Sequence, residues 1–368
     1  MAQIAGPTCG YRVVQIHPLL KCNLRCLHCY STSSPDQLPA LALDRLCGAL
    51  DFLRLEGFNA VGVSGGEPLL YAELPALLRH IRTLGMISTV TTNAMLVDDQ
   101  RAAMLRELAS IVAVSVDGPP ESHNRFRAHP KAFERMTEGV GRLKKAGVPF
   151  GFIFTLTLHN LHELAWIAEF AAGQGAALLQ IHPLEEVGRA TGLLPGCAPD
   201  ALELARAFVE VARLQNQYKD TLTLQYDVAD LDVLRATPER GYAVQACAVR
   251  DATETAAVPL ADLMAPIIIE ADGAIVPLQY NFSRAYQIGN LTRPGLPEQI
   301  NRWKTGGFQQ FLDLCRDVYD QLLQPGFAEY PFANWYGAVL QASHAATTSA
   351  AVSPAKPRST AQKIIAGS

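Results

Sequence analysis

Three cysteines lie close together near the N-terminus, at separations of four and three residues. They are Cys22, Cys26 and Cys29, and the other five of the eight cysteines are scattered singly. Cysteine sulfur holds iron–sulfur clusters, and a loop with this spacing can wrap one face of a four-iron cluster. Three ligands leave one iron without a protein partner, which is the open position that a catalytic metal site keeps. Two alternatives remain: a structural zinc site with His28 as fourth ligand, and three unrelated core thiols.

The run from Cys22 to Tyr30, Cys-x-x-x-Cys-x-x-Cys-Tyr, resembles the signature of the radical S-adenosylmethionine (radical SAM) enzymes. The resemblance implies one [4Fe-4S] cluster on Cys22, Cys26 and Cys29, with the fourth iron chelated by S-adenosylmethionine (SAM). It also implies cleavage of SAM to methionine and a 5′-deoxyadenosyl radical, which abstracts hydrogen from the substrate. In such an enzyme the cofactor carries the difficult chemistry.

A glycine-rich segment, Ser64-Gly65-Gly66-Glu67-Pro68, directly follows the second apolar run. Two glycines free the backbone to approach a ligand closely, and Glu67 can accept a hydrogen bond from an ammonium group. The resemblance assigns Gly65, Gly66 and Glu67 to the amino group of SAM. Without that context, the segment is an ordinary turn.

Small polar residues end the third and fourth apolar runs, and a basic stretch follows the fourth. The resemblance places Asn93, Ser115 and Asp117 near the ribose and carboxylate of SAM, and it directs Arg127 at the carboxylate. A guanidinium group is the natural bidentate partner of a carboxylate. The alternatives are that Asn93 and Asp117 start turns or cap helices, and that Arg127 is a solvated loop residue.

The sixth apolar run leads into Gln180-Ile181-His182-Pro183-Leu184. The resemblance places this strand beside the adenine of SAM, where backbone groups and apolar side chains make the contacts, so Ile181 and Leu184 are candidates. His182 could be a polar group on the substrate side, although a histidine in such a place is more often a structural residue with a hydrogen bond.

These residues must be positioned by the elements between them, and short apolar runs alternate with helical periodicity up to residue 181. Strands are predicted over 11–16, 59–64, 87–92, 111–116, 149–158 and 176–181, and helices over 42–56, 74–83, 98–108, 132–145 and 161–174. The alternation predicts an α/β fold with a parallel sheet. Together with the resemblance, it predicts a partial (β/α)6 TIM-like radical SAM barrel over residues 1–195, whose loops at the strands' carboxyl ends carry the chemistry.

A small α+β extension is predicted over residues 196–340. It contains a helix over 198–218, a strand over 221–226 and a hairpin over 267–277, turned at Asp272-Gly273. The hairpin resembles the SPASM or twitch extension of radical SAM enzymes, which holds auxiliary [4Fe-4S] clusters. Here Leu278 replaces an expected cysteine and the late cysteine cluster is missing, so we expect a vestigial extension without clusters. Residues 341–368, rich in Ala, Ser and Thr, are predicted to be a disordered tail.

The isolated cysteines Cys197, Cys247 and Cys315 suggest one further role. Without auxiliary clusters, redox-neutral reactions such as epimerisation are favoured, and one of these thiols could return a hydrogen atom to the substrate radical. The alternative is that each cysteine is a small buried hydrophobic residue. They could also converge in space and hold metal together.

Composition limits the partners. The 368 residues carry a formal charge of −4, with 49% hydrophobic and 18% charged residues, which is ordinary globular composition. Because no basic run or long apolar segment is present, neither nucleic acid nor membrane is expected, and a cytoplasmic location is predicted. The resemblance implies a reductant such as flavodoxin or ferredoxin. There is no room before Tyr11 for a peptide-recognition domain, so a separate leader-binding protein is a further expected partner.

Three functions remain open. The first is a radical SAM enzyme acting on a ribosomally synthesised peptide, by epimerisation or crosslinking. The second is a radical SAM enzyme acting on a small metabolite such as a tetrapyrrole, a sugar or an amino-acid derivative. The third, a non-catalytic iron–sulfur or zinc protein, is opposed by the combination of the cysteines, Gly65-Gly66-Glu67 and Arg127.

Overall fold

The structure, a computed structural model, describes residues 10–38, 40–237, 252–324 and 330–351. A ten-stranded sheet organises it, in the order β11-β10-β9-β1-β2-β3-β4-β5-β6-β7. Seven neighbouring strands are parallel: β1 (Val13–Ile16), β2 (Ala60–Val63), β3 (Ile87–Thr92), β4 (Ile111–Val116), β5 (Phe150–Leu156), β6 (Leu178–Pro183) and β7 (Thr223–Tyr226). The predicted partial barrel of parallel strands is confirmed.

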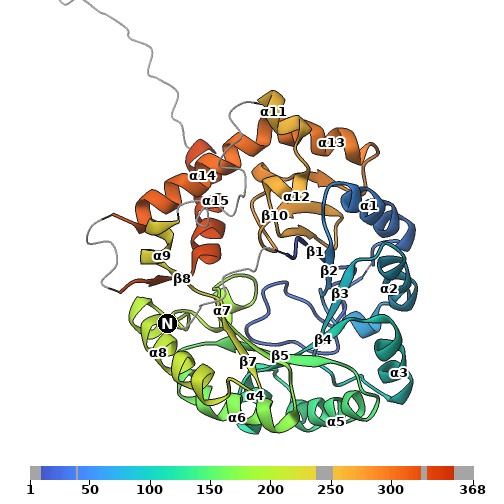
Figure 1. The fold of residues 1–368 in the computed structure, drawn as a ribbon, viewed down its shortest axis with the longest axis vertical. Coiled ribbons are helices and arrows are strands. Elements are labelled where there is room, and N and C mark those ends of the chain that lie inside the picture. The colour runs from blue at the N-terminus through green and yellow to red at the C-terminus, as the bar shows by residue number, and fades with distance from the viewer. Residues whose placement is uncertain (1–9, 39, 238–251, 325–329, 352–368) are drawn as a thin grey trace, which may run out of the picture.

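Helices cover the outer face of this curved sheet (Figure 1). They are α1 (Leu43–Leu55), α2 (Leu74–Thr83), α3 (Asp99–Leu108), α5 (Ala132–Lys145), α6 (Leu164–Gln174) and α8 (Ala201–Gln217). In α2 the residues Leu74, Leu77, Leu78 and Ile81 are buried, at the spacing that places them on one helix face. Two short helices, α4 (Pro120–Phe126) and α7 (Ala190–Leu193), follow β4 and β6.

Alternation along the strands separates the two faces of the sheet. In β4, Val112, Val114 and Val116 are fully buried in the core shared with the helices, whereas Ala113 and Ser115 are partly exposed. Successive side chains of a strand point to opposite faces, so Ala113 and Ser115 lie on the inner face of the curved sheet. Polar residues on this inner face can therefore contact a loop or a ligand that lies inside the curve of the sheet.

The C-terminal extension continues the same sheet. The predicted hairpin is confirmed as β9 (Ile267–Ile269) and β10 (Ala274–Pro277), and β9 pairs in parallel with β1. Strand β11 (Gly289–Asn290) adds to β10. The boundary expected between residues 195 and 196 therefore does not divide the sheet, because β7 and β9 pair with the two edges that the six barrel strands would otherwise expose.

The remaining elements of the extension pack mostly on one side of the ring (Figure 1). They are β8 (Ala229–Asp230), α9 (Leu231–Ala236), α11 (Ala252–Ala257), α12 (Leu260–Leu263), α13 (Leu296–Arg302), a π-helical segment (Trp303–Gly307), α14 (Phe308–Leu322), β12 (Phe332–Ala333) and α15 (Trp335–Ala351). Residues 341–351 belong to α15, so the disordered tail expected from residue 341 is wrong over this part. Alanine is the best helix former, which explains the difference. Residues 352–368 lie outside the described part of the chain.

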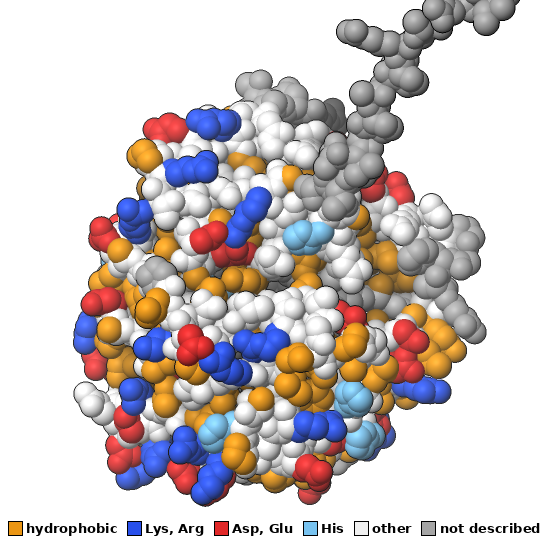
Figure 2. All heavy atoms as spheres, turned by 180° about the vertical axis from the view of Figure 1, so that it is seen from behind, with side chains coloured by type: hydrophobic (Ala, Val, Ile, Leu, Met, Phe, Trp, Pro, Cys, Tyr) orange, Lys and Arg blue, Asp and Glu red, His pale blue; other side chains and the backbone are white. Residues whose placement is uncertain are grey.

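No helix among the described residues is long and apolar enough to cross a membrane. On the face seen in Figure 2, acidic and basic side chains are interspersed.

Candidate active site

The cysteine loop connects β1 to α1 and lies within the ring formed by the strands (Figure 1). Cys22 and Cys26 are buried, and Cys29 is partly buried. The three cysteines pack in one small cluster with Leu24 and Met95. The loop thus begins at the carboxyl end of the first strand and returns all three thiols to one place.

These thiols suit a multi-iron cluster better than a single ion. No three His, Cys, Asp or Glu side chains of the described residues converge on a position for one metal ion. In a [4Fe-4S] cluster each thiolate binds a different iron, so three neighbouring thiols need not share one point. Burial raises the pKa of Cys22 to about 12, and binding of metal must therefore displace its proton. The residues fit the cluster.

Arg189 holds the cysteine loop in place. Its side chain donates to the carbonyl oxygens of Cys26 and Ser33, both at 2.7 Å, and its backbone N–H donates to Cys29 O at 2.9 Å. The preceding Gly188 has φ +59°, and a Cβ there would lie 2.2 Å from Tyr30 O. No local sequence pattern predicts this role of Arg189, because its contacts join segments about 160 residues apart in the chain.

The two glycines after β2 contact the cysteine loop itself. A Cβ on Gly66 would lie 2.1 Å from Lys21 O, and one on Gly65 would lie 2.6 Å from Leu19 O. Glu67 N donates to Lys21 O at 2.9 Å. Glycine is therefore required at both positions by the close approach of the cysteine-loop backbone.

Glu67 is buried at the carboxyl end of β2 and joins three segments. It accepts hydrogen bonds from Thr92 Oγ1 at 2.7 Å, from Asn93 N at 2.9 Å and from Leu69 N at 3.1 Å. Burial raises the pKa of Glu67, although these hydrogen bonds oppose the shift. Asn93 Nδ2 in turn donates to Asn23 Oδ1 of the cysteine loop at 2.9 Å. The end of β3 is thereby tied to the loop.

Arg127 and Asp117 form a buried ion pair beside the loop, so the alternative of a solvated arginine is wrong. Arg127 Nε lies 2.6 Å from Asp117 Oδ2, and Arg127 Nη1 lies 3.8 Å from Cys26 Sγ. Burial opposes the charge of Asp117, but the guanidinium outweighs it and the pKa of Asp117 is lowered. His28 Nε2 is 3.7 Å from the other carboxylate oxygen, Oδ1. A positive charge is therefore held next to Cys26.

The remaining predicted contact residues lie in different surroundings. Ser115 lies on the inner face of β4, as expected for a ligand contact. Ile181 is fully buried in the core beneath the helices, so its side chain faces away from the ring, and the prediction for this side chain is wrong. Alternation puts its neighbours Gln180 and His182 inward instead. Leu184 packs in a small separate cluster that includes Phe126.

The isolated cysteines do not form one site in the described residues. Cys315 is fully buried in the core on α14, and burial raises its pKa to about 12. Cys197 packs at the edge of the Leu184 cluster, and its Sγ lies 3.3 Å from His159 Nε2. Cys247 lies outside the described residues. The structure supports the small-hydrophobe interpretation for Cys315 and places Cys197 at the carboxyl-end side of β5.

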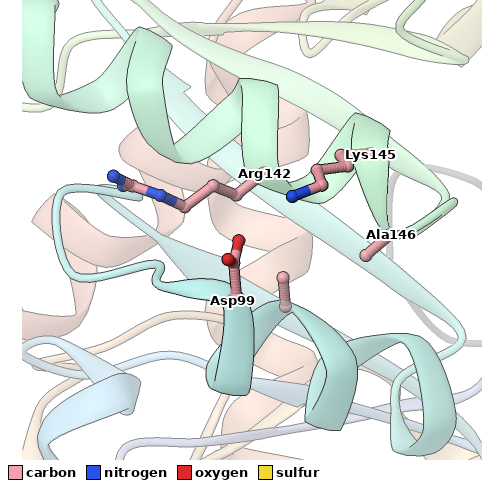
Figure 3. A pocket seen from close by; sticks show the side chains of 5 residues that line it. Asp99, Arg142, Lys145 and Ala146 are labelled. Atoms are coloured by element: carbon pink, nitrogen blue, oxygen red, sulfur yellow. The ribbon is translucent and has the colours of Figure 1, made fainter.

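A shallow depression on the outer surface involves none of these groups. It lies between α3 and α5 and is lined by Asp99, Ala102, Arg142, Lys145 and Ala146 (Figure 3). Both helices lie on the outer face of the sheet, whereas the groups described above gather at the strand ends inside the ring. We therefore place the candidate active site at the strand ends inside the ring and not at this depression.

Comparison with known proteins agrees with this placement. Residues 16–171 match the radical SAM superfamily. The chain is 32% identical over 191 residues to an AdoMet-dependent heme synthase of Oleidesulfovibrio alaskensis, covering 51% of this chain and 49% of that protein. It is 23% identical over 204 residues to the sporulation killing factor maturation protein SkfB of Bacillus subtilis, covering 55% of this chain and 49% of that protein. The chain thus spans about half the length of the curated relatives it matches.

Solved structures share the fold at low sequence identity. Streptococcus suis SuiB bound to S-adenosylmethionine superposes with a TM-score of 0.61 at 17% identity, covering 81% of this chain and 68% of SuiB. The protein anSMEcpe with bound AdoMet gives a TM-score of 0.59 at 15% identity, covering 93% of this chain and all of that one. The match to the radical SAM superfamily spans residues 16–171, which include the cysteine loop, Glu67 and the Asp117–Arg127 ion pair.

Proposed function

We propose that this protein is a radical SAM enzyme that modifies a ribosomally synthesised peptide. The observation that carries the proposal is the gathering of Cys22, Cys26 and Cys29 in one loop within the ring, at the carboxyl end of the first strand. Cys22, Cys26 and Cys29 would hold the cluster, and the cluster with SAM would supply radical chemistry that removes hydrogen from the substrate.

The chain's own residues position that chemistry. We assign the Gly65–Glu67 segment and Asn93 to the amino-acid end of SAM, because Glu67 binds the end of β3 directly beside the cysteine loop. Ser115 offers a hydroxyl from the inner face of β4. Asp117 orients Arg127, whose positive charge lies near Cys26 and can meet the SAM carboxylate. Leu184 is assigned to the adenine side.

The substrate assignment rests on two kinds of similarity. SkfB and the subtilosin biosynthesis protein AlbA, both of Bacillus subtilis, are relatives named for peptide products, and SuiB has been crystallised with a precursor peptide. A structural likeness at this low identity supports the fold alone, so the peptide assignment remains a proposal. Flavodoxin or ferredoxin is the proposed reductant, and a separate leader-binding protein the proposed partner.

The second candidate is a tetrapyrrole or another small metabolite. It is favoured by relatives of about 30% identity that are named heme synthases, among them one from Methanosarcina barkeri at 33% over 172 residues. A neighbouring short reading frame that encodes a precursor peptide would favour the first candidate. Neighbouring genes for tetrapyrrole synthesis would favour the second.

The experiment that tests the enzyme assignment is anaerobic reconstitution followed by iron and sulfide analysis and dithionite-driven cleavage of SAM. We expect about four irons per chain and formation of 5′-deoxyadenosine. Cys26→Ala should lose both. Cys47→Ala is the matched control, because Cys47 is a partly exposed thiol on α1 outside the loop. Bound zinc without iron, or equal cleavage by Cys26→Ala, would contradict the assignment.

A further inference from the structure

Polar side chains gather at the ends of β6 and β7. His182 Nδ1 lies 3.4 Å from Asp227 Oδ2, and His182 Nε2 lies 3.7 Å from Glu185 Oε1. Gln180 Nε2 donates to Asp227 Oδ2 at 2.6 Å. The imidazole of His182 therefore lies between the carboxylates of Asp227 and Glu185. Gln180, from the same strand as His182, holds the carboxylate of Asp227 in place.

This group faces the hollow of the ring. His182 lies on the inner face of β6, and its side chain is 35% exposed. Gly188, three residues after Glu185, lies against the backbone of Tyr30, since a Cβ on Gly188 would come within 2.2 Å of Tyr30 O. Because Tyr30 directly follows Cys29, the polar group and the cysteine loop border the same space.

The C-terminal extension supplies one more polar side chain. Gln279, two residues beyond β10, donates from Nε2 to Glu185 Oε1 at 2.5 Å. Its Oε1 is buried and has no hydrogen-bond partner among the described residues. A buried acceptor left unpaired costs free energy, so an N–H group that reaches this oxygen is favoured.

The charge on this side of the ring is negative. Even when His182 is protonated, Asp227 and Glu185 leave a net charge of −1 on the group. None of the described strands contains a lysine or an arginine. Arg189, four residues after Glu185, and Arg127 are already bound to the cysteine loop and to Asp117. The described strands thus offer no ammonium or guanidinium group to a substrate carboxylate, and these are the usual strong partners of such a group.

We propose that His182, Asp227, Glu185 and Gln279 form a substrate subsite that binds a cationic N–H donor of a peptide, namely a lysine or arginine side chain. The carboxylates supply the charge, and Gln279 Oε1 accepts a hydrogen bond. This deepens the proposed function by naming a substrate feature, and it rests on that function. A tetrapyrrole with several carboxylates does not fit this surface, because like charges would be brought together.

The test is calorimetric binding at low ionic strength to anaerobically reconstituted full-length protein with SAM. The probes are two capped tripeptides, acetyl-Gly-Lys-Gly-amide and acetyl-Gly-Glu-Gly-amide, and iron coproporphyrin III. The wild type should bind the lysine peptide at least about tenfold more tightly than the glutamate peptide. Asp227→Asn and Glu185→Gln should each reduce this preference, and Glu210→Gln, on the exposed side of α8, should keep it.

Equal binding of the two peptides, no binding of the lysine peptide, or tighter binding of iron coproporphyrin III by the wild type would each overturn the subsite. Circular dichroism of Asp227→Asn and Glu185→Gln checks that both variants are folded. If one of them does not fold, the other still tests the subsite. The proposed function fails separately. A protein that prefers the lysine peptide but does not cleave SAM keeps the subsite and loses the enzyme assignment.

Discussion

The cysteine loop and the C-terminal extension both carry thiols, but the thiols of the loop are held by polar contacts and Cys315 of the extension is held by apolar packing. In the loop, hydrogen bonds to backbone carbonyls and a buried ion pair surround Cys26, with Arg189 and Arg127 as the donors. In the extension, Cys315 is surrounded by apolar side chains on α14 and has no charged neighbour that shifts its pKa. Hydrogen bonds and ion pairs suit a site that must hold a charged group, whereas apolar packing suits an element with a purely structural role.

The strongest test of this contrast is Gly66→Ala. The new Cβ would lie 2.1 Å from Lys21 O, which is backbone and cannot move aside without shifting the cysteine loop. We expect less than a tenth of the wild-type iron after reconstitution and a loss of stability of about 3 kcal/mol. Gly48→Ala on α1, which meets nothing within 4 Å, is the control. Normal iron content in Gly66→Ala would mean that the loop is not held by this contact.

The next effect is expected from Asp117→Asn. This substitution leaves Arg127 buried without its carboxylate, and breaking a buried pair in this way costs about 3 kcal/mol or more. Arg127 should then turn toward Cys26, so we expect altered affinity for SAM together with lower stability in denaturant. Asp232→Asn removes an exposed partner of Arg235 and should change neither.

A third test uses pH, because buried neutral histidines lie beside the loop. Burial lowers the pKa of His123 to about 3, and its Nδ1 accepts a hydrogen bond from Asp117 N. The neutral histidine therefore stabilises the fold above the unfolded pKa of about 6.5, and this stability is lost as the pH falls from there toward 3. Between pH 7 and pH 5 the contribution is about 2 kcal/mol.

His123→Asn should remove that part of the pH dependence while keeping an acceptor for Asp117 N. The measurement is the free energy of unfolding in denaturant at pH 7 and pH 5. His162→Asn, at an exposed histidine, should leave the difference between the two pH values unchanged. An unchanged slope in His123→Asn would show that His123 is protonated in the folded state.

The same contrast explains which parts of the molecule could be predicted from sequence. The bounds of β3, β4, α2 and α5 follow from local periodicity and agree with the structure residue for residue. The cysteine cluster is local as well, since its three thiols lie within eight residues. Periodicity is a property of neighbouring residues, so it carries this information directly.

The contacts that complete the site join distant segments, and no local pattern encodes them. The clamp of Arg189 on Cys26, the approach of Gly66 to Lys21 and the reach of Gln279 to Glu185 all depend on how the strands assemble. Ile181 was misplaced for a related reason. A one-residue step along a strand reverses the face, so a prediction that names the strand can still choose the wrong side chain.

The smallest expected effect separates Cys197 from Cys315, two of the isolated thiols among the described residues. Cys197→Ala and Cys315→Ala should both keep full iron content, because neither thiol lies in the cysteine loop. In the native protein a thiol reagent should label Cys197, which is partly exposed beside His159, and Cys197→Ala should take up one label fewer. Cys315 should react only on unfolding, and its substitution should cost about 1 kcal/mol of packing. Labelling of Cys315 in the folded state would show that the extension opens without global unfolding, which would contradict rigid apolar packing around α14.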